Sequence, residues 1–310
     1  MLSMNRRTFL ATSLGAGTAL AAASTQKLKL SVFTKHLQFL KGADPLAEAI
    51  ASIGFDGADV ALRKGGTIEP ERAREEFPKL IKALASRGVS TPMITSGIVD
   101  VDSPFAEPVL ALLKDHGIRY YRWGGFRYDY KQPLAGQLEA AKPRVAKLAE
   151  LNRKYDVCAI YHTHSGLNQI GASIWDIREI LKDFDPAHVA INYDIGHATV
   201  EGGFGGWINS FYISGKHLRG IALKDFVWIK ARKRPDWCPV GEGMVDFPAF
   251  FAMVAKNGFD GPLQVHYEYP LGGAESGKTE IAISPEQVFN AMKKDLAALR
   301  GLIKQAGFQS

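Results

Sequence analysis

Runs of apolar, β-branched residues recur along this chain at intervals of about 30 to 43 residues, with helix-like segments between them. Eight such runs begin near Leu28, Gly57, Val89, Ile118, Val157, Val189, Arg219 and Pro262. Eight alternating strand and helix units are the number that closes a parallel barrel. No interdomain linker separates them, so we predict an α/β fold, a single (β/α)8 TIM barrel.

Turn residues support this division of the chain. Glycine stands where a helix ends and the next strand approaches, at Gly54, Gly88, Gly117 and Gly258. Glycine adopts the left-handed conformation that helix ends favour. Ser284-Pro285-Glu286 has the composition of a helix start, and apolar residues spaced for one helix face follow it. The last helix is therefore expected to begin at Ser284.

Composition excludes several classes of protein. Of 310 residues, 46% are hydrophobic, which is too many for a disordered chain. No run of about 20 apolar residues occurs beyond the N-terminal segment, so a multi-span membrane protein is excluded. Cys158 and Cys238 are the two cysteines, and their spacing fits neither a disulfide scaffold nor a zinc knuckle.

The N-terminus has the pattern of a targeting signal. Arg6 and Arg7 precede an apolar stretch that ends in Ala21-Ala22-Ala23, and this resembles a bacterial twin-arginine export signal. We expect residues 1–23 to be a signal peptide and residues 24–310 to be the barrel. The resemblance implies contact with the twin-arginine export machinery and a periplasmic or otherwise exported protein with no stable membrane span after cleavage.

The charge pattern bears on macromolecular partners. The formal net charge is +6, and cleavage would remove two of the arginines. No Lys/Arg stripe interleaved with aromatic residues occurs, so we expect no nucleic-acid partner. Whether the chain forms a homo-oligomer is left open.

In a TIM barrel the chemistry is at the C-terminal ends of the strands. Read in order, the expected strand ends carry the polar residues Lys35, His36, Asp59, Arg63, Thr95, Ser96, Arg122, His162, His164, Asp194, His197, Lys224, Asp225, His266 and Glu268. Five of the eight histidines are among them. Imidazoles and carboxylates that meet at one end of a barrel can bind divalent ions or transfer protons.

Ordered motifs carry a family resemblance. They are Asn192-Tyr193-Asp194-Ile195-Gly196-His197-Ala198, then Lys224-Asp225, then Val240-Gly241-Glu242-Gly243-Met244-Val245-Asp246-Phe247, then a last strand ending in Glu268. This order resembles the sugar phosphate isomerase/epimerase family of xylose isomerase-like barrels. The resemblance implies a divalent metal held by residues of the fifth to eighth strands, with Asp194 and Glu268 as two of its ligands and His197 near the substrate.

Two positions depart from the family pattern. His162, in Tyr161-His162-Thr163-His164, stands where the family has its first glutamate, and Ala222 stands where the H-x-K-D motif has its histidine. One interpretation is a metal (Mn, Zn, Co or Mg) held by His162, Asp194 and Glu268, with His164 or His266 replacing the missing imidazole. A second is metal-free catalysis with Lys224 as electrophile and Glu268 or His162 as base. A third is a barrel that only binds sugar.

The family chemistry is removal of a proton next to a carbonyl, followed by stabilisation of an enediolate. We expect His162, His197, Lys224 and Glu268 to be catalytic, and His162, Asp194, His266 and Glu268 to hold the metal. The predicted function is an exported isomerase or epimerase of a sugar or keto-sugar. A keto-glycoside lyase using the same proton abstraction and a non-catalytic periplasmic carbohydrate-binding barrel are the alternatives.

Further residues are predicted to contact a small carbohydrate. Arg122 and Trp123 begin an aromatic and basic loop suited to stacking on a sugar and binding hydroxyls or an anion. His36 and His164 are assigned to the same role. Residues 272–279 match the letters of a phosphate-binding P-loop, but an extended segment follows instead of the helix that such a loop requires. We expect a flap there, from which Lys278 reaches the substrate.

Overall fold

A closed barrel of eight parallel strands forms the centre of the computed structural model, which describes residues 27–309. Around the barrel the strands follow the order β1-β10-β7-β6-β5-β4-β3-β2. Their bounds are β1 (Leu30–Phe33), β2 (Gly57–Leu62), β3 (Ser90–Ser96), β4 (Tyr120–Trp123), β5 (Cys158–His162), β6 (Val189–Asp194), β7 (Leu218–Leu223) and β10 (Leu263–Val265). The predicted (β/α)8 barrel is confirmed, whereas the predicted signal peptide, residues 1–23, lies outside the described residues.

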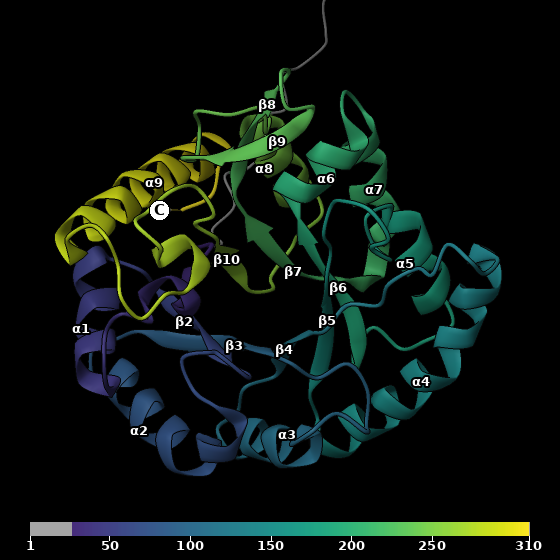
Figure 1. Cartoon of the computed structure of the whole chain (residues 1–310), viewed down its shortest axis with the longest axis horizontal. Helices are drawn as coiled ribbons and strands as arrows, with labels where there is room; N and C mark the ends of the chain where they lie inside the picture. Colours follow the sequence, from purple (N-terminus) through teal and green to yellow (C-terminus); the bar gives the residue numbers. More distant parts are fainter. Residues whose placement is uncertain (1–26, 310) are drawn as a thin grey trace, which may run out of the picture.

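Helices surround the barrel as an outer ring (Figure 1). They are α1 (Ala43–Ile53), α2 (Ala73–Ala85), α3 (Ala106–Asp115), α4 (Leu134–Tyr155), α5 (Ile174–Leu181), α6 (Ile195–Gly202), α7 (Gly206–Ser214), α8 (Phe247–Lys256) and α9 (Pro285–Gln305). Short 3-10 turns occur at η1 (Thr34–Leu37), η2 (Pro70–Arg72), η3 (Gly215–His217) and η4 (Ala274–Ser276). The helices bury one apolar face each against outward-facing strand residues and form the main core, while Met93, Cys158, Ile160 and Ala190 form a second, small cluster.

Local sequence signals place the ends of these helices. Gly54 follows α1 with φ of 102°, and Gly88, Gly117 and Gly258 are also left-handed, as predicted. Ser284 begins α9 through a capping box, in which its side chain accepts from the Gln287 N–H and the Gln287 side chain accepts in return. The boundaries are thus fixed by backbone chemistry that is local in sequence.

A two-stranded antiparallel hairpin, β8 (Asp225–Ile229) and β9 (Arg234–Cys238), follows β7 and was not predicted from the sequence. Its first residue, Asp225, accepts hydrogen bonds from the backbone N–H groups of Gly241, Gly243 and Val245. A Cβ on Gly243 would lie 2.2 Å from Asp225 Oδ1, so only glycine fits there. The G-E-G-x-V-D-F motif is therefore a loop held by a buried carboxylate.

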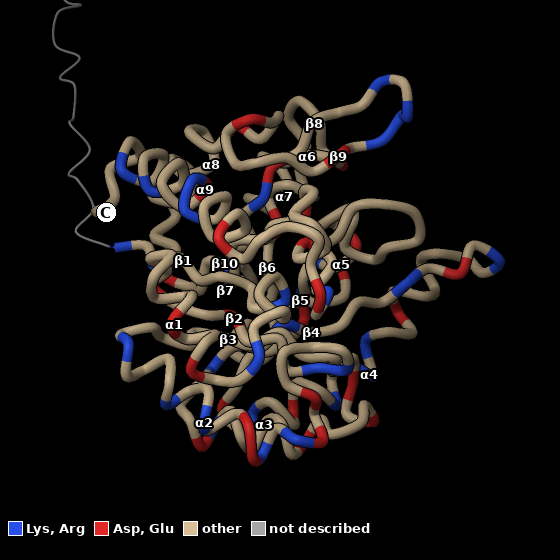
Figure 2. The backbone as a smooth tube through the Cα atoms, turned by 60° about the vertical axis from the view of Figure 1, so that its left-hand side comes forward, with Lys and Arg blue, Asp and Glu red and all other residues tan. Residues whose placement is uncertain are grey.

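The outer surface is polar and mixed in charge. Figure 2 shows acidic and basic residues interspersed along α2, α3 and α4. No helix within residues 27–309 has the length and apolar character needed to cross a membrane. Both cysteines are free thiols, as expected from their spacing.

Candidate active site at the barrel mouth

The side chain of Lys224 is the centre of a polar cluster at the C-terminal ends of the strands, here called the barrel mouth. Lys224 follows β7 directly and is 2% exposed. Its Nζ donates to His197 Nε2 at 2.7 Å and lies 3.1 Å from Asp194 Oδ2 and 3.2 Å from Glu268 Oε1. The Trp237 ring of the hairpin covers the ammonium group at 4.2 Å. Groups from four segments thus converge on one buried cation.

The D-x-G-H motif explains how Asp194 and His197 reach Lys224. Asp194 ends β6 and caps α6, since its Oδ1 accepts from the His197 N–H at 3.0 Å. A Cβ on Gly196 would lie 2.8 Å from Lys224 Cγ and 2.9 Å from the Lys224 carbonyl oxygen. Glycine at this position therefore allows the first turn of α6 to pack against Lys224.

The hydrogen bonds around His197 and His164 determine which ring nitrogen carries a proton. Because the Lys224 ammonium donates to His197 Nε2, His197 Nδ1–H donates to Ser165 Oγ at 2.7 Å. His164 Nδ1–H donates to the His162 carbonyl oxygen, and its Nε2 accepts from Arg122 Nη2 at 3.1 Å. Burial, together with Arg122 and Lys224, lowers the pKa of His164 to about 3, so the ring is neutral at pH 7.

Glu268 is ionised and open to the mouth. Burial raises its pKa, but the Lys224 ammonium and His266 outweigh burial and hold the pKa well below its usual range. Its side chain keeps 26% exposure, in contrast to Asp194, which is fully buried. Glu268 is consequently the carboxylate that can meet a substrate as a base.

His162, Asp194 and His266 form a group that fits a divalent ion. Each offers one ligand atom, and these atoms lie within 4.8 Å of one another. Asp194 Oδ2 and His266 Nε2 are buried without a hydrogen-bond partner, although Oδ2 is close to charged Lys224. Burial lowers the pKa of His266 to about 3, which leaves a neutral imidazole as metals require. Two imidazoles and one carboxylate leave an open position on an ion such as zinc.

The amide pair Asn192 and Gln264 determines which ring nitrogen of His162 carries a proton. The two amides exchange hydrogen bonds at 3.0 and 3.1 Å, and Asn192 Nδ2 also donates to His162 Nδ1 at 3.0 Å. In that orientation His162 Nε2 carries the ring proton and faces Asp194 Oδ2 at 3.4 Å. Turning both amides together preserves their mutual bonds and presents an acceptor to His162 Nδ1–H. His162 Nε2 is then free to bind an ion.

A second imidazole group, His162, His164 and His197, also satisfies the distance requirement for a metal. However, the Nε2 atoms of His164 and His197 already accept from Arg122 and Lys224. The group that contains Asp194 is therefore the better metal site. Glu268, predicted as a ligand, belongs to neither group and pairs with Lys224 instead.

Two predicted substrate contacts, His36 and Trp123, are buried and hydrogen-bonded within the protein, and their role in substrate binding stays a prediction. His36 is fully buried, its Nε2 accepts from the Tyr267 N–H at 3.1 Å, and its Nδ1–H donates to the Ala274 carbonyl oxygen. Both ring nitrogens are used to hold η1 against the chain after β10. Trp123 is 1% exposed, and its Nε1–H donates to the Val99 carbonyl oxygen while its ring packs on Phe126 and Tyr161. It is a packing residue.

The structure places Lys278 on the segment after Glu268, where its exposed side chain lies over Gly273. No contact with the mouth residues is seen for this side chain, so its predicted role stays a prediction.

The P-loop interpretation of residues 272–279 is excluded, because η4 is three residues long and α9 begins only at Pro285.

Sequence analysis assigned no role beside Lys224 or the histidines to three residues that contribute to the site. Ser165 and Asn192 set histidine protonation, and Trp237 reaches Lys224 only because the unpredicted hairpin folds over the mouth. Asn192 precedes Asp194 by two residues and so faces the same way, which is the signal that could have identified it.

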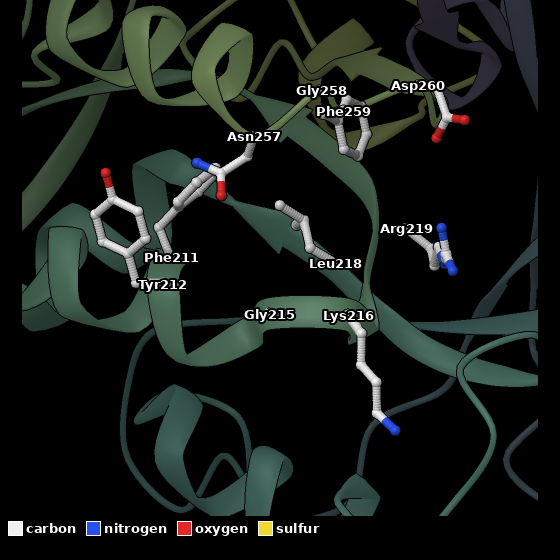
Figure 3. A pocket seen from close by; sticks show the side chains of 10 residues that line it. All are labelled: Phe211, Tyr212, Gly215, Lys216, Leu218, Arg219, Asn257, Gly258, Phe259 and Asp260. Carbon is white, nitrogen blue, oxygen red and sulfur yellow. The ribbon is translucent and has the colours of Figure 1, made fainter.

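A separate hollow of about 310 Å³ lies near the N-terminal end of β7, between α7 and the loop before β10 (Figure 3). Lys216, Arg219 and Asp260 line it with both signs of charge. It is at the opposite end of the strands from Lys224, and in this fold that end contributes to stability.

The closed parallel barrel with imidazole, carboxylate and ammonium groups at its strand ends defines a TIM barrel of the kind that hosts chemistry at its mouth. The family model described as "Xylose isomerase-like TIM barrel" matches residues 47–300, and the chain therefore belongs to that family. This agrees with the resemblance drawn from the D-x-G-H and G-E-G-x-V-D-F motifs.

Comparison with curated proteins gives one relative, the rhizopine catabolism protein MocC of Rhizobium meliloti. It is 26% identical over 215 residues, which are 59% of this chain. The chain spans 65% of the length of that relative.

Solved structures share the fold at low sequence identity. 3-Keto-D-glucoside 4-epimerase YcjR from E. coli has a TM-score of 0.64 and 17% identity, covering 89% of this chain and 100% of its own. An L-ribulose 3-epimerase has a TM-score of 0.67 and 14% identity, covering 90% and 96%. The IOLI protein, with a bound zinc atom, has a TM-score of 0.67 and 13% identity, covering 89% and 98%.

Proposed function

We propose that this chain is an exported isomerase or epimerase of a sugar or keto-sugar, acting by removal of a proton next to a carbonyl. The observation that carries the proposal is the position of Lys224, whose Nζ lies within 3.2 Å of both Asp194 and Glu268 at the barrel mouth. Family membership and the epimerases among the similar structures support the reaction class.

Each side chain has a distinct role in this proposal. Glu268 is ionised and partly exposed, so it removes the proton from carbon and returns it. The Lys224 ammonium stabilises the negative charge that develops on the substrate oxygen, and His197 and Trp237 hold the ammonium in place. Asp194 pairs with the buried Lys224 ammonium at 3.1 Å and fixes its position.

A divalent ion bound by His162, Asp194 and His266 would act as a Lewis acid on substrate oxygens. The proton-transfer role predicted for His162 stays a prediction, since its ring is buried against His266 at 5.2 Å between centroids. Ala222 is fully buried and pairs in register with Asp194 and Gln264. The missing family histidine thus leaves a methyl group beside the site, and His266 supplies an imidazole.

Conversion of a panel of keto-sugars, followed by chromatography, tests the reaction. We expect wild-type protein to convert at least one member and Glu268→Gln to lose activity by about 10²-fold or more, as removal of a positioned base does. Glu242→Gln, on the surface beside Lys294, is the matched control and should retain activity. Equal activity of Glu268→Gln and wild type would contradict the assignment.

Metal content, measured by mass spectrometry on protein purified with added divalent ions, tests the ion site separately. We expect about one ion per chain in wild type and its loss in an Asp194→Ala, His266→Ala double variant. Retention of the ion in that variant would exclude this group as the site.

Export is proposed from Arg6 and Arg7 and the apolar stretch that follows them, which ends in Ala21-Ala22-Ala23. Fractionation of cells expressing the full chain should place it outside the cytoplasm, and Arg6→Lys, Arg7→Lys should retain it inside. Replacement of Lys27 and Lys29, beyond the signal, is the control. Identical distribution of wild type and the twin-lysine variant would rule out the twin-arginine route.

A further inference from the structure

Three cationic side chains at the barrel mouth form no ion pair with the residues that the structure describes. Lys35 lies just after β1, Arg63 just after β2, and Arg122 within β4. Within residues 27–309, no carboxylate oxygen lies within 4.0 Å of the charged nitrogens of these three residues, in contrast to Lys224. We call these residues the cation trio.

The trio is compact and faces the mouth. Lys35 Nζ and Arg63 Cζ each lie 5.6 Å from the centroid of the Phe33 ring, and the His266 ring packs on Phe33 at 5.0 Å. Arg122 reaches the site through His164 Nε2 at 3.1 Å. All three residues are partly buried, and none of them lies on the open outer surface.

The electrostatic effects on the pKa values of these residues agree with their proximity. Burial lowers the pKa of Lys35 to about 8; Glu268 raises it, while Lys224, Arg63 and Arg122 lower it. Burial and then Arg63 lower the pKa of Arg122 to about 10. Neighbouring cations therefore disfavour the charged forms of Lys35 and Arg122, and a bound anion would relieve this repulsion.

Nearby acids do not neutralise the trio. Asp59 is fully buried, its Oδ2 accepts from Thr95 Oγ1 at 2.8 Å, and its Oδ1 has no hydrogen-bond partner. Burial raises the pKa of Asp59 to about 7, so its charge is incomplete at neutral pH. Glu268 is paired with Lys224. The Nε of Arg63 is likewise buried without a partner.

We propose that the substrate carries an anionic group, a carboxylate or a phosphate, and that Lys35, Arg63 and Arg122 bind it. This inference rests on the proposed function, since it assigns the substrate class of the same site: a sugar acid or a sugar phosphate. Guanidinium groups bind both anions through paired N–H donors, and a lysine adds a point charge. The hydroxyl groups of a neutral sugar would leave the buried cations uncompensated.

Calorimetric titration of the full chain separates the two sources of the anion. The probes are D-glucuronate, D-glucose 6-phosphate and inorganic phosphate, with D-glucose as the neutral control. We expect at least one anionic probe to bind about ten-fold or more tightly than D-glucose, with an affinity that falls as NaCl is added. Tighter binding of the glucuronate indicates a carboxylate, and tighter binding of the phosphates indicates a phosphate.

An Arg63→Met, Arg122→Met double variant should weaken binding of the preferred anion about ten-fold or more and leave D-glucose unaffected. Arg74→Met, on the exposed face of α2, is the control. Lys35→Met gives an independent variant should the double variant not fold. Equal binding of acids and D-glucose by wild type, or unchanged anion binding by folded variants, would overturn the inference.

These titrations need no turnover, so their failure differs from failure of the proposed function. Anion binding that depends on the trio, without any conversion of keto-sugars, would refute the reaction and retain the subsite. Conversion of neutral keto-sugars at a rate unaffected by Arg63→Met and Arg122→Met would retain the reaction and refute the anion subsite.

Discussion

At the residue scale, the buried ammonium of Lys224 compensates the negative charges of Asp194 and Glu268. Asp194 is fully buried, and burial raises its pKa to about 6 although Lys224 opposes the rise. Without Lys224 the negative charges of Asp194 and Glu268 would have no paired cation in this buried site, which would destabilise the folded state. We therefore expect Lys224 to contribute to stability as well as to the proposed chemistry.

Lys224→Met is expected to destabilise the protein by about 3–5 kcal/mol, which is typical when one partner of a buried ion pair is removed. Chemical denaturation at pH 7 measures the change. Lys278→Met, at an exposed position, should change stability by less than about 0.5 kcal/mol. If Lys224→Met were as stable as wild type, the compensation described above would not exist.

Asp59 supplies a prediction about pH. Its folded pKa of about 7 exceeds the ordinary 3.8, so its ionisation disfavours the folded state, and the penalty grows as pH rises from about 4 to 7. Asp59→Asn should thus gain stability relative to wild type over that range, by up to about 4 kcal/mol, and the gain should be constant above it.

Denaturation of both proteins at pH 5 and pH 8 measures this difference. Asp260→Asn, near the other end of the barrel, provides the control. A stability gap that is the same at the two pH values would show that Asp59 titrates normally.

At the element scale, the first turn of α6 is responsible for bringing Asp194 and His197 to Lys224. Gly196→Ala would place a Cβ 2.8 Å from Lys224 Cγ. We expect a displaced Lys224 and an activity lower by about 10²-fold, because small misplacements of catalytic groups are costly.

Gly206→Ala, in the first turn of α7, is the matched control, since a Cβ there meets no atom within 4 Å. Initial rates of both variants on the same keto-sugar give the comparison. Full activity of Gly196→Ala would show that the close packing of α6 on Lys224 is dispensable.

Elements differed in how far the sequence could predict them. The barrel strands were placed within two residues, because a strand buried on both faces leaves a run of apolar residues. The hairpin was missed because Lys230, Arg232, Lys233 and Arg234 make its segment too polar for that pattern. The burial of His36 and Trp123 was not predicted, because a strand end gives the position of a residue and leaves its hydrogen-bond partners unknown.

At the scale of the whole molecule, the barrel gathers residues far apart in the sequence into one mouth. Lys35 and Glu268 are separated by most of the chain, yet Glu268 has a direct electrostatic effect on the pKa of Lys35. The parallel barrel achieves this by placing every strand end on the same side. The proposed base, ammonium, ion ligands and cation trio thus lie at the same end of the barrel.

Exchange of solvent deuterium into substrate carbon tests the central claim most directly, because it detects proton removal even when turnover is slow. Mass spectrometry on keto-sugars, including keto-sugar acids and phosphates, incubated with metal-loaded protein in D₂O gives the readout. We predict incorporation at one carbon next to the carbonyl, abolished by Glu268→Gln. Absence of deuterium from every member of the panel, with the ion bound and the protein folded, would contradict the account.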